Sequence, residues 1–283
     1  MNVVALALAA AITYGGADFF GGLAGRRAAI LTVVVATQFI GLLTLLVFLP
    51  FGHGTFEVGD VRWALACGLA GAVAIALFYR GLAIGTMGVV SPISAIIAAL
   101  IPIGFGLVRG EHPGFFALIG MVCALLAVAF VSVGGKSDPS SKNRTAFLAP
   151  GLLEAIAAGI AFGFFFVALA QTSRDGGFYP LIITRFVSLA IAASAALVVR
   201  VPLIAARESW PTLVACGVLD MSANMLYVLA SHLGLLSIAA VLSSLYPAAT
   251  VALAAIVLGE RLTRTQSIGV LAAIIGVALI AAT

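Results

Sequence analysis

Charged side chains are scarce in this chain. Of its 283 residues, 14 are Lys or Arg and 10 are Asp or Glu, so that 8% are charged, against about 25% in a typical soluble domain. Hydrophobic residues make up 63%. A single soluble core of this size cannot enclose so much apolar surface, and most of it must face lipid. The shortage of charge therefore excludes a soluble globular domain and predicts an integral membrane protein.

The motifs of enzymes are also missing. The sequence has no phosphate-binding loop, no HExxH pair and no nucleophile elbow. Its three cysteines, Cys67, Cys123 and Cys216, lie in apolar runs without metal-ligand spacing, and we interpret them as small packing residues. The few basic residues lie between apolar runs, which is typical of membrane-protein loops and not of a nucleic-acid-binding face. We expect no enzymatic activity, no cofactor, no metal and no nucleic-acid partner.

Long apolar stretches dominate what is present. A spanning helix needs about 20 largely apolar residues, and ten stretches qualify: 2–24, 30–49, 63–84, 89–108, 114–133, 147–170, 179–199, 211–233, 237–258 and 267–282. The longest polar interruption, 134–144, falls between the fifth and the sixth. We therefore predict an all-α protein with a first five-helix repeat at 1–133, a polar linker at 134–146 and a second five-helix repeat at 147–283.

The two halves of the chain also repeat each other at a shift of 149 residues. Ala66-Cys67-Gly68 recurs as Ala215-Cys216-Gly217, and Gly110-Glu111 recurs as Gly259-Glu260. Because each repeat holds an odd number of spans, the two repeats must point in opposite directions. Inverted repeats place a binding site at their interface near the membrane midplane, where one half rocks against the other. The pattern predicts ten transmembrane helices in two inverted repeats and favours a transporter.

One phrase in the second repeat is specific. Leu258-Gly259-Glu260-Arg261-Leu262 follows Pro247 and precedes Gln266-Ser267-Ile268-Gly269, and the first repeat has a looser copy at Arg109-Gly110-Glu111-His112-Pro113. This phrase resembles the signature of the EamA domain of the drug/metabolite transporter superfamily, and two such domains would cover essentially the whole chain. Within that superfamily the chain most resembles the YddG-type amino-acid exporters.

The resemblance implies a basket of ten helices in the bacterial cytoplasmic (inner) membrane, with the fifth and tenth spans peripheral. It implies a secondary transporter or facilitator that exports amino acids, aromatic or otherwise neutral, or related small metabolites by alternating access. The alternatives are an exporter of other metabolites or drugs, proton-coupled or not, a passive channel, and a membrane enzyme or lipid-handling protein. The GxxxG spacings are interpreted as packing within one chain, so a monomer in lipid is expected, with a dimer motif as the alternative.

The orientation of the chain is predicted in two opposite ways. Loops after odd-numbered spans hold nine basic residues and loops after even-numbered spans hold three. The positive-inside rule then places the odd-numbered loops in the cytoplasm and both termini outside. The family resemblance implies both termini in the cytoplasm. Both orientations stay open at this point.

Three ionisable residues lie inside predicted spans, where each costs about 2.5–3.5 kcal/mol at a helix centre. Arg185 aligns with Gln38 in the repeat and is either a counter-charge for a substrate carboxylate or a structural arginine. Asp18 and Asp220 are the acids deepest in the membrane, and either one is a candidate to carry a proton or to bind a substrate amine. Asp18 alternatively lies near a membrane surface, paired with an arginine at the end of its own span.

Two prolines fall at matching places in the repeats, Pro92 in the fourth span and Pro247 in the ninth. Each removes one helical hydrogen bond and frees a carbonyl, and unpaired backbone at membrane depth is tolerated where it lines a cavity. We expect matched helix breaks here that act in gating, with simple packing kinks as the alternative. Uncharged polar residues near the breaks and on the facing spans are the expected substrate contacts: Tyr79, Ser91, Ser94, Asn224, Tyr227, Ser243, Ser244 and Tyr246.

Overall fold

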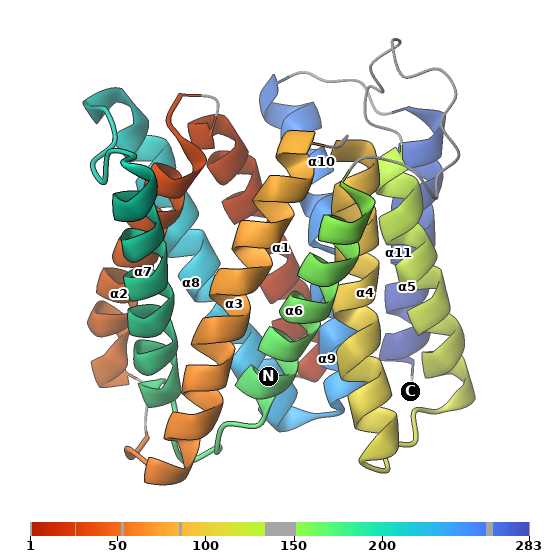
Figure 1. The fold of residues 1–283 in the computed structure, drawn as a ribbon. Helices are drawn as coiled ribbons and strands as arrows, with labels where there is room; N and C mark the ends of the chain where they lie inside the picture. The colour runs from red at the N-terminus through yellow and green to blue at the C-terminus, as the bar shows by residue number, and fades with distance from the viewer. Residues whose placement is uncertain are drawn as a thin grey trace.

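The chain is described by a computed structural model that covers residues 2–25, 27–51, 54–84, 87–133, 151–258 and 263–282. Its regular elements in these ranges are all helical, as predicted (Figure 1). The α-helices are α1 (Val3–Gly25), α2 (Ile30–Phe48), α3 (Val58–Ile84), α4 (Met87–Val108), α5 (Phe115–Val133), α6 (Leu152–Ala170), α7 (Tyr179–Val199), α8 (Trp210–Leu233), α9 (Leu236–Ser243), α10 (Tyr246–Leu258) and α11 (Arg264–Ala281). The predicted polar linker lies outside the described residues.

Within the described residues, eight segments are long and apolar enough to cross a membrane, with α9 and α10 together forming one of them. The apolar parts of α4 and α5 that can be assessed, Ile93–Val108 and Phe115–Val131, are shorter. The count of ten spans therefore stays a prediction, although each of the ten predicted stretches coincides with helix in the structure.

The corresponding helices of the two halves run in opposite directions. In Figure 1, α1 begins at the lower end of the bundle and α11 ends there, whereas α6 begins at the upper end. We use "lower end" and "upper end" in this sense throughout. Helix α6 runs alongside α4 in the same direction, since Gly159 meets Ile97 and Gly163 meets Ile101. This arrangement is what an odd number of crossings per half requires.

Each half contributes helices to both sides of the interior. Helix α1 packs on α8, α9 and α10, whereas α6 packs on α3 and α4. The α1–α8 contact is tight, because a Cβ atom on Gly16 would lie 2.9 Å from Leu219 Cδ1 and one on Gly21 would lie 3.2 Å from Cys216 Sγ. Small residues allow such close approach in lipid, where apolar burial does not drive helices together.

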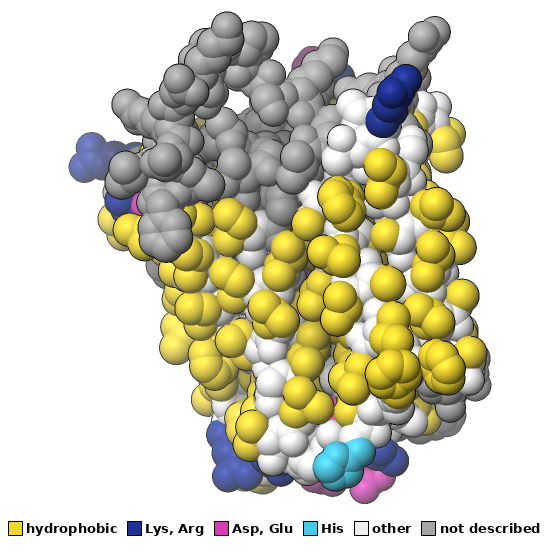
Figure 2. All heavy atoms as spheres, turned by 90° about the vertical axis from the view of Figure 1, so that its right-hand side faces the viewer, with side chains coloured by type: hydrophobic (Ala, Val, Ile, Leu, Met, Phe, Trp, Pro, Cys, Tyr) yellow, Lys and Arg dark blue, Asp and Glu magenta, His cyan; other side chains and the backbone are white. Residues whose placement is uncertain are grey.

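Helices α5 and α11 form a pair at one side of the bundle (Figure 1). Their backbones touch, because a Cβ atom on Gly120 would lie 2.7 Å from the carbonyl oxygen of Gly276, and one on Gly276 would lie 2.8 Å from that of Gly120. Hydrophobic side chains cover the outer face of this pair, and the charged ones gather toward its two ends (Figure 2). The pair is therefore peripheral and presents an apolar face suited to lipid.

The ninth predicted span is broken and the fourth is not. Helix α9 ends at Ser243, and α10 begins at Tyr246, directly before Pro247. Helix α4 runs without interruption from Met87 to Val108, across Pro92. The prediction of matched breaks is therefore wrong for α4. Pro92 is the sixth residue of that helix, so the one bond it removes, to the carbonyl of Gly88, lies near the helix start, and the hydrogen-bond ladder continues beyond it.

Candidate functional site

A buried arginine joins three helices inside the bundle. Arg185 of α7 has a side chain that is 8% exposed, and its Nη2 lies 2.5 Å from Oδ2 of Asp220 on α8. The same guanidinium donates to Oε1 of Gln38 on α2 and, through Nε, to Sδ of Met221 at 3.3 Å. These contacts use all three nitrogen atoms of the guanidinium as hydrogen-bond donors. The geometry therefore favours the structural interpretation of Arg185, in which its charge is already matched by Asp220.

Asp18 of α1 differs from Asp220 in that it is exposed and forms no ion pair with any residue the structure describes. It lies between α8 and α10, close enough to interact electrostatically with Asp220 and Cys216 of α8 and with Tyr246 of α10. Of the two arginines at the end of its span that were candidates to pair with Asp18, Arg27 forms no such pair, and Arg26 lies outside the described residues. The cluster thus holds two acids and one arginine, and Asp18 supplies the unmatched carboxyl.

A polar chain links α1 to the arginine cluster. Tyr14 donates its hydroxyl proton to Asn224 Oδ1 at 3.1 Å, and Asn224 Nδ2 donates to the backbone carbonyl of Asp220 at 2.7 Å. Sequence reasoning missed Tyr14. The signal was present, because Tyr14 lies four residues before Asp18 and side chains at that spacing share one helix face. Tyr14 and Asp18 therefore present a hydroxyl and a carboxyl from the same side of α1.

Aromatic rings surround this polar chain. The ring of Tyr14 meets Phe166 of α6 edge to face at 6.1 Å and Tyr246 of α10 at 6.4 Å between centroids. Tyr227 of α8 lies 4.8 Å from Phe166 and is fully buried, and its hydroxyl donates to the Phe166 carbonyl at 3.4 Å. Tyr227 is thus a wall residue held in the core, whereas Tyr14 and Tyr246 are only partly buried.

The predicted serines turn inward to backbone groups. Ser243 Oγ lies 3.5 Å from the Ala7 carbonyl, and Ser244 Oγ donates to the Val241 carbonyl of its own helix at 2.7 Å. Both serines are buried, and so is Ser94 of α4. The structure therefore groups Asn224, Tyr227 and Tyr246 with the charged cluster, and it leaves the serines on the neighbouring helices. The side chains of Tyr79, Ser91 and Pro92 lie outside the described residues.

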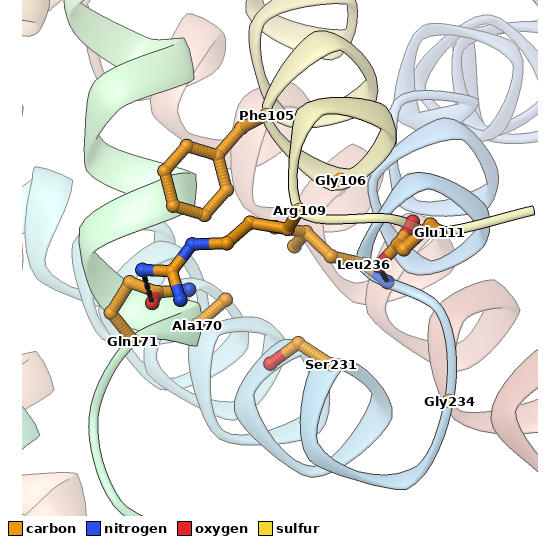
Figure 3. Close-up of a pocket in the computed structure, with 9 residues that line it drawn as sticks. All are labelled: Phe105, Gly106, Arg109, Glu111, Ala170, Gln171, Ser231, Gly234 and Leu236. Carbon is orange, nitrogen blue, oxygen red and sulfur yellow. Dashed lines mark hydrogen bonds between the residues drawn. The ribbon is translucent and has the colours of Figure 1, made fainter.

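A separate pocket of about 280 Å³ lies at the lower end of the bundle (Figure 3). It is bounded by the end of α4, the end of α6 and the connection between α8 and α9. Gly234 in this connection lies against Val3 at the start of α1, which places the pocket near the N-terminal end of α1. No group of three or more His, Cys, Asp or Glu suited to a metal occurs in the part of the chain that the structure describes.

Apolar helices in two opposed halves, with a charged cluster buried between them, define a membrane transport protein of the inverted-repeat class. The chain belongs to the EamA-like transporter family, which matches residues 1–133 and 149–282. This match confirms the sequence resemblance at the level of the family and places the protein in the drug/metabolite transporter superfamily. The membership rests on both halves of the chain.

Among solved structures, one titled "Crystal structure of protein" matches with a TM-score of 0.78 over 99% of this chain and 98% of that chain. The two sequences are 14% identical, so this likeness concerns the fold alone. A comparison with curated proteins gives no match.

Proposed function

We propose that this transporter exports neutral amino acids, aromatic ones included, or related small metabolites across the bacterial cytoplasmic membrane by alternating access. The observation that carries the proposal is Asp18, an exposed carboxyl inside a predicted span without an ion-pair partner among the described residues. A charge at that depth costs about 2.5–3.5 kcal/mol. A substrate ammonium supplies the missing partner, whereas Arg185 and Asp220 already satisfy each other.

The surroundings of Asp18 suit an amphipathic amine. Tyr246 lies near enough to interact electrostatically with Asp18, and Tyr14 lies one helical turn before Asp18. Phe166 extends the aromatic wall around Tyr14. Aromatic faces attract cations and also provide an apolar surface for a side chain. The remaining predicted contacts, namely Tyr79, Ser91, Ser94, Asn224, Tyr227, Ser243 and Ser244, belong to the same proposal as hydrogen-bonding or wall residues.

The broken ninth span offers a hinge for alternating access. Ser244 and Leu245 form a turn between α9 and α10, and hinges are commonly a few residues at the ends of helices. In the proposal, residues 1–133 and 147–283 form the two moving halves, and Pro247 keeps α10 from fusing with α9. Pro92 stays a predicted gating residue, although α4 is continuous across it.

The test measures efflux from proteoliposomes loaded with a panel of neutral amino acids. A hydrogen bond to a charged group contributes about 1.5–3 kcal/mol, so Asp18→Asn should lower transport about tenfold or more, and Asp18→Glu should retain part of it. Glu208→Gln is the matched control, because Glu208 is an exposed acid in a connecting turn, and it should transport like wild type. Wild-type rates in Asp18→Asn, or no amino acid moved by the wild type, would contradict the proposal.

Asp18 also favours a second candidate, a proton-coupled exporter of other metabolites or drugs, because a lone carboxyl between two helices is suited to carry a proton. The same vesicles distinguish the two functions when a pH gradient is imposed. For a proton carrier, Asp18→Asn abolishes gradient-driven accumulation but keeps exchange of substrate across the membrane. For an ammonium ligand, the same variant loses both.

A further inference from the structure

The pocket at the lower end carries a positive charge, that of Arg109. The side chain of Arg109 extends across the pocket (Figure 3), and its guanidinium carbon lies 5.1 Å from the centroid of the Phe105 ring. Nη2 donates to Oε1 of Gln171, at the end of α6, at 3.2 Å. A cation held over a ring and by an amide is oriented before any ligand arrives. The charge of the guanidinium is not neutralised by a counter-ion, because Arg109 has no ion pair with a described residue.

The acid in the same pocket does not compensate Arg109, because Glu111 is engaged by the start of α9. Its Oε1 accepts from the Leu236 backbone N–H at 2.6 Å, and its Oε2 accepts from the N–H and the hydroxyl of Ser237 at 3.1 and 2.6 Å. The positive end of the helix dipole and these donors stabilise the carboxylate. In Figure 3 Glu111 lies on the α9 side and the guanidinium lies on the α6 side. Arg109 therefore sets the electrostatic character of the open part of the pocket.

We propose that this pocket is a vestibule site that binds the carboxylate of a small organic molecule, with Arg109 as its ligand. A guanidinium presents five N–H donors in a fork that matches the two oxygens of a carboxylate. Among bonds between described residues, one of these donors is used, by Gln171. The inference rests on the proposed function for its role, which is to collect or release an amino acid by its carboxylate at one end of the passage. The binding chemistry itself does not depend on that role.

Binding to the purified full-length protein tests the site independently of transport. Phenylacetate is the probe, and phenylacetamide is its neutral counterpart of the same shape. Arg109→Gln should weaken phenylacetate binding at least about tenfold, since hydrogen bonds to charged groups are lost, and it should leave phenylacetamide binding unchanged. Arg62→Gln is the matched control, because Arg62 is an exposed arginine 5.6 Å from the centroid of an aromatic ring, that of Trp63, and lies outside the pocket.

Two further variants guard against a folding artefact. Arg109→Lys keeps the charge but not the fork and should bind phenylacetate with intermediate affinity. Ser231→Phe fills the pocket from α8 and should also abolish binding, with Arg109 unchanged. Equal phenylacetate affinity in wild type and Arg109→Gln would overturn the inference, as would an equal loss of phenylacetamide.

Because the pocket lies at an end of the spans, a lipid phosphate is the other source of an anion. In micelles that contain phosphatidylglycerol, an effect of Arg109→Gln on lipid binding alone, without any effect on phenylacetate, would assign the charge to lipid and overturn the carboxylate site. The failure of the proposed function can be told apart from the failure of the pocket proposal. If the proposed function fails, no amino acid is transported, but phenylacetate still binds through Arg109. If the pocket proposal fails, phenylacetate does not bind, and amino acids are transported equally well with and without Arg109.

Discussion

At the scale of single residues, the ion pairs inside the helices distinguish charges with a structural role from the charge to which we assign a role in transport. Arg185, Asp220 and Gln38 satisfy one another across three helices, whereas Asp18 stands without a described counter-ion. Sequence reasoning identified all three ionisable residues, because charges in apolar runs are conspicuous. It could not tell which acid pairs with the arginine, because pairing depends on how each helix is rotated.

The Arg185–Asp220 pair leads to a prediction on stability. Asp220→Ala leaves a buried guanidinium without its counter-ion, and breaking a buried pair in this way costs about 3–5 kcal/mol. We expect a lower figure here, because the Asp220 side chain is 32% exposed. The measurement is thermal unfolding of the purified protein in detergent.

The double variant Asp220→Ala/Arg185→Met removes both charges and should recover part of the loss, because no unmatched ion remains. Ser222→Ala on the same helix serves as the control and should unfold like wild type. A double variant that is no more stable than Asp220→Ala would show that the pair does not act as a unit.

At the scale of helices, apolar length alone defined most of the boundaries. The predicted 179–199 agrees with α7 at both ends. Helix α3 begins at Val58, five residues before the predicted start, because its first two turns carry Asp60 and Arg62, which an apolar search rejects. The break between α9 and α10 was predicted from Pro247, but the same reasoning failed for α4, because Pro92 lies near the helix start and removes a single bond there.

Glu111, the acid in the first copy of the signature-like phrase, caps the start of α9. The carboxylate comes from the loop after α4 and satisfies two backbone N–H groups at the start of α9, which would otherwise lack partners. The capped helix belongs to the other half of the chain, and no local pattern shows that contact.

The α5–α11 crossing leads to a prediction at the scale of helix packing. Gly120→Ala places a Cβ atom 2.7 Å from the Gly276 carbonyl oxygen, closer than van der Waals contact permits, so the helices must separate. We expect a loss of about 1–3 kcal/mol, as for other overpacked sites, measured as a lower unfolding temperature. Gly22→Ala on α1 is the matched control, because nothing lies within 4 Å of its new Cβ, and it should be neutral or slightly stabilising.

At the scale of the whole molecule, the distribution of basic residues between the two ends of the bundle bears on the orientation of the chain in the membrane. In or beside the described connections, the upper end carries Arg27, Arg200, Arg207 and Arg264, and the lower end carries Arg62, Arg109 and Arg174. The described ends thus differ by one basic residue, and the excess predicted for one side comes mainly from residues outside the described ranges. The sequence count, nine against three, still favours a cytoplasmic upper end.

Reporter fusions decide the orientation. A fusion after Lys142 should report cytoplasm, and a fusion after Thr55, in the connection between α2 and α3, should report the opposite side. The reverse pattern would place both termini in the cytoplasm, as the family resemblance implies. It would also place the Arg109 pocket on the cytoplasmic side, where it would meet a substrate before export instead of after it.

The close contact of α5 with α11 has a mechanical consequence for the transport cycle proposed above. These helices come from different halves, yet their backbones touch at Gly120 and Gly276, at one side of the bundle (Figure 1). Points near such a contact can turn but cannot slide far apart without losing it. In the proposed cycle the pair is the fulcrum: displacement grows with distance from it, so a small rotation here would become a larger opening across the far side of the protein.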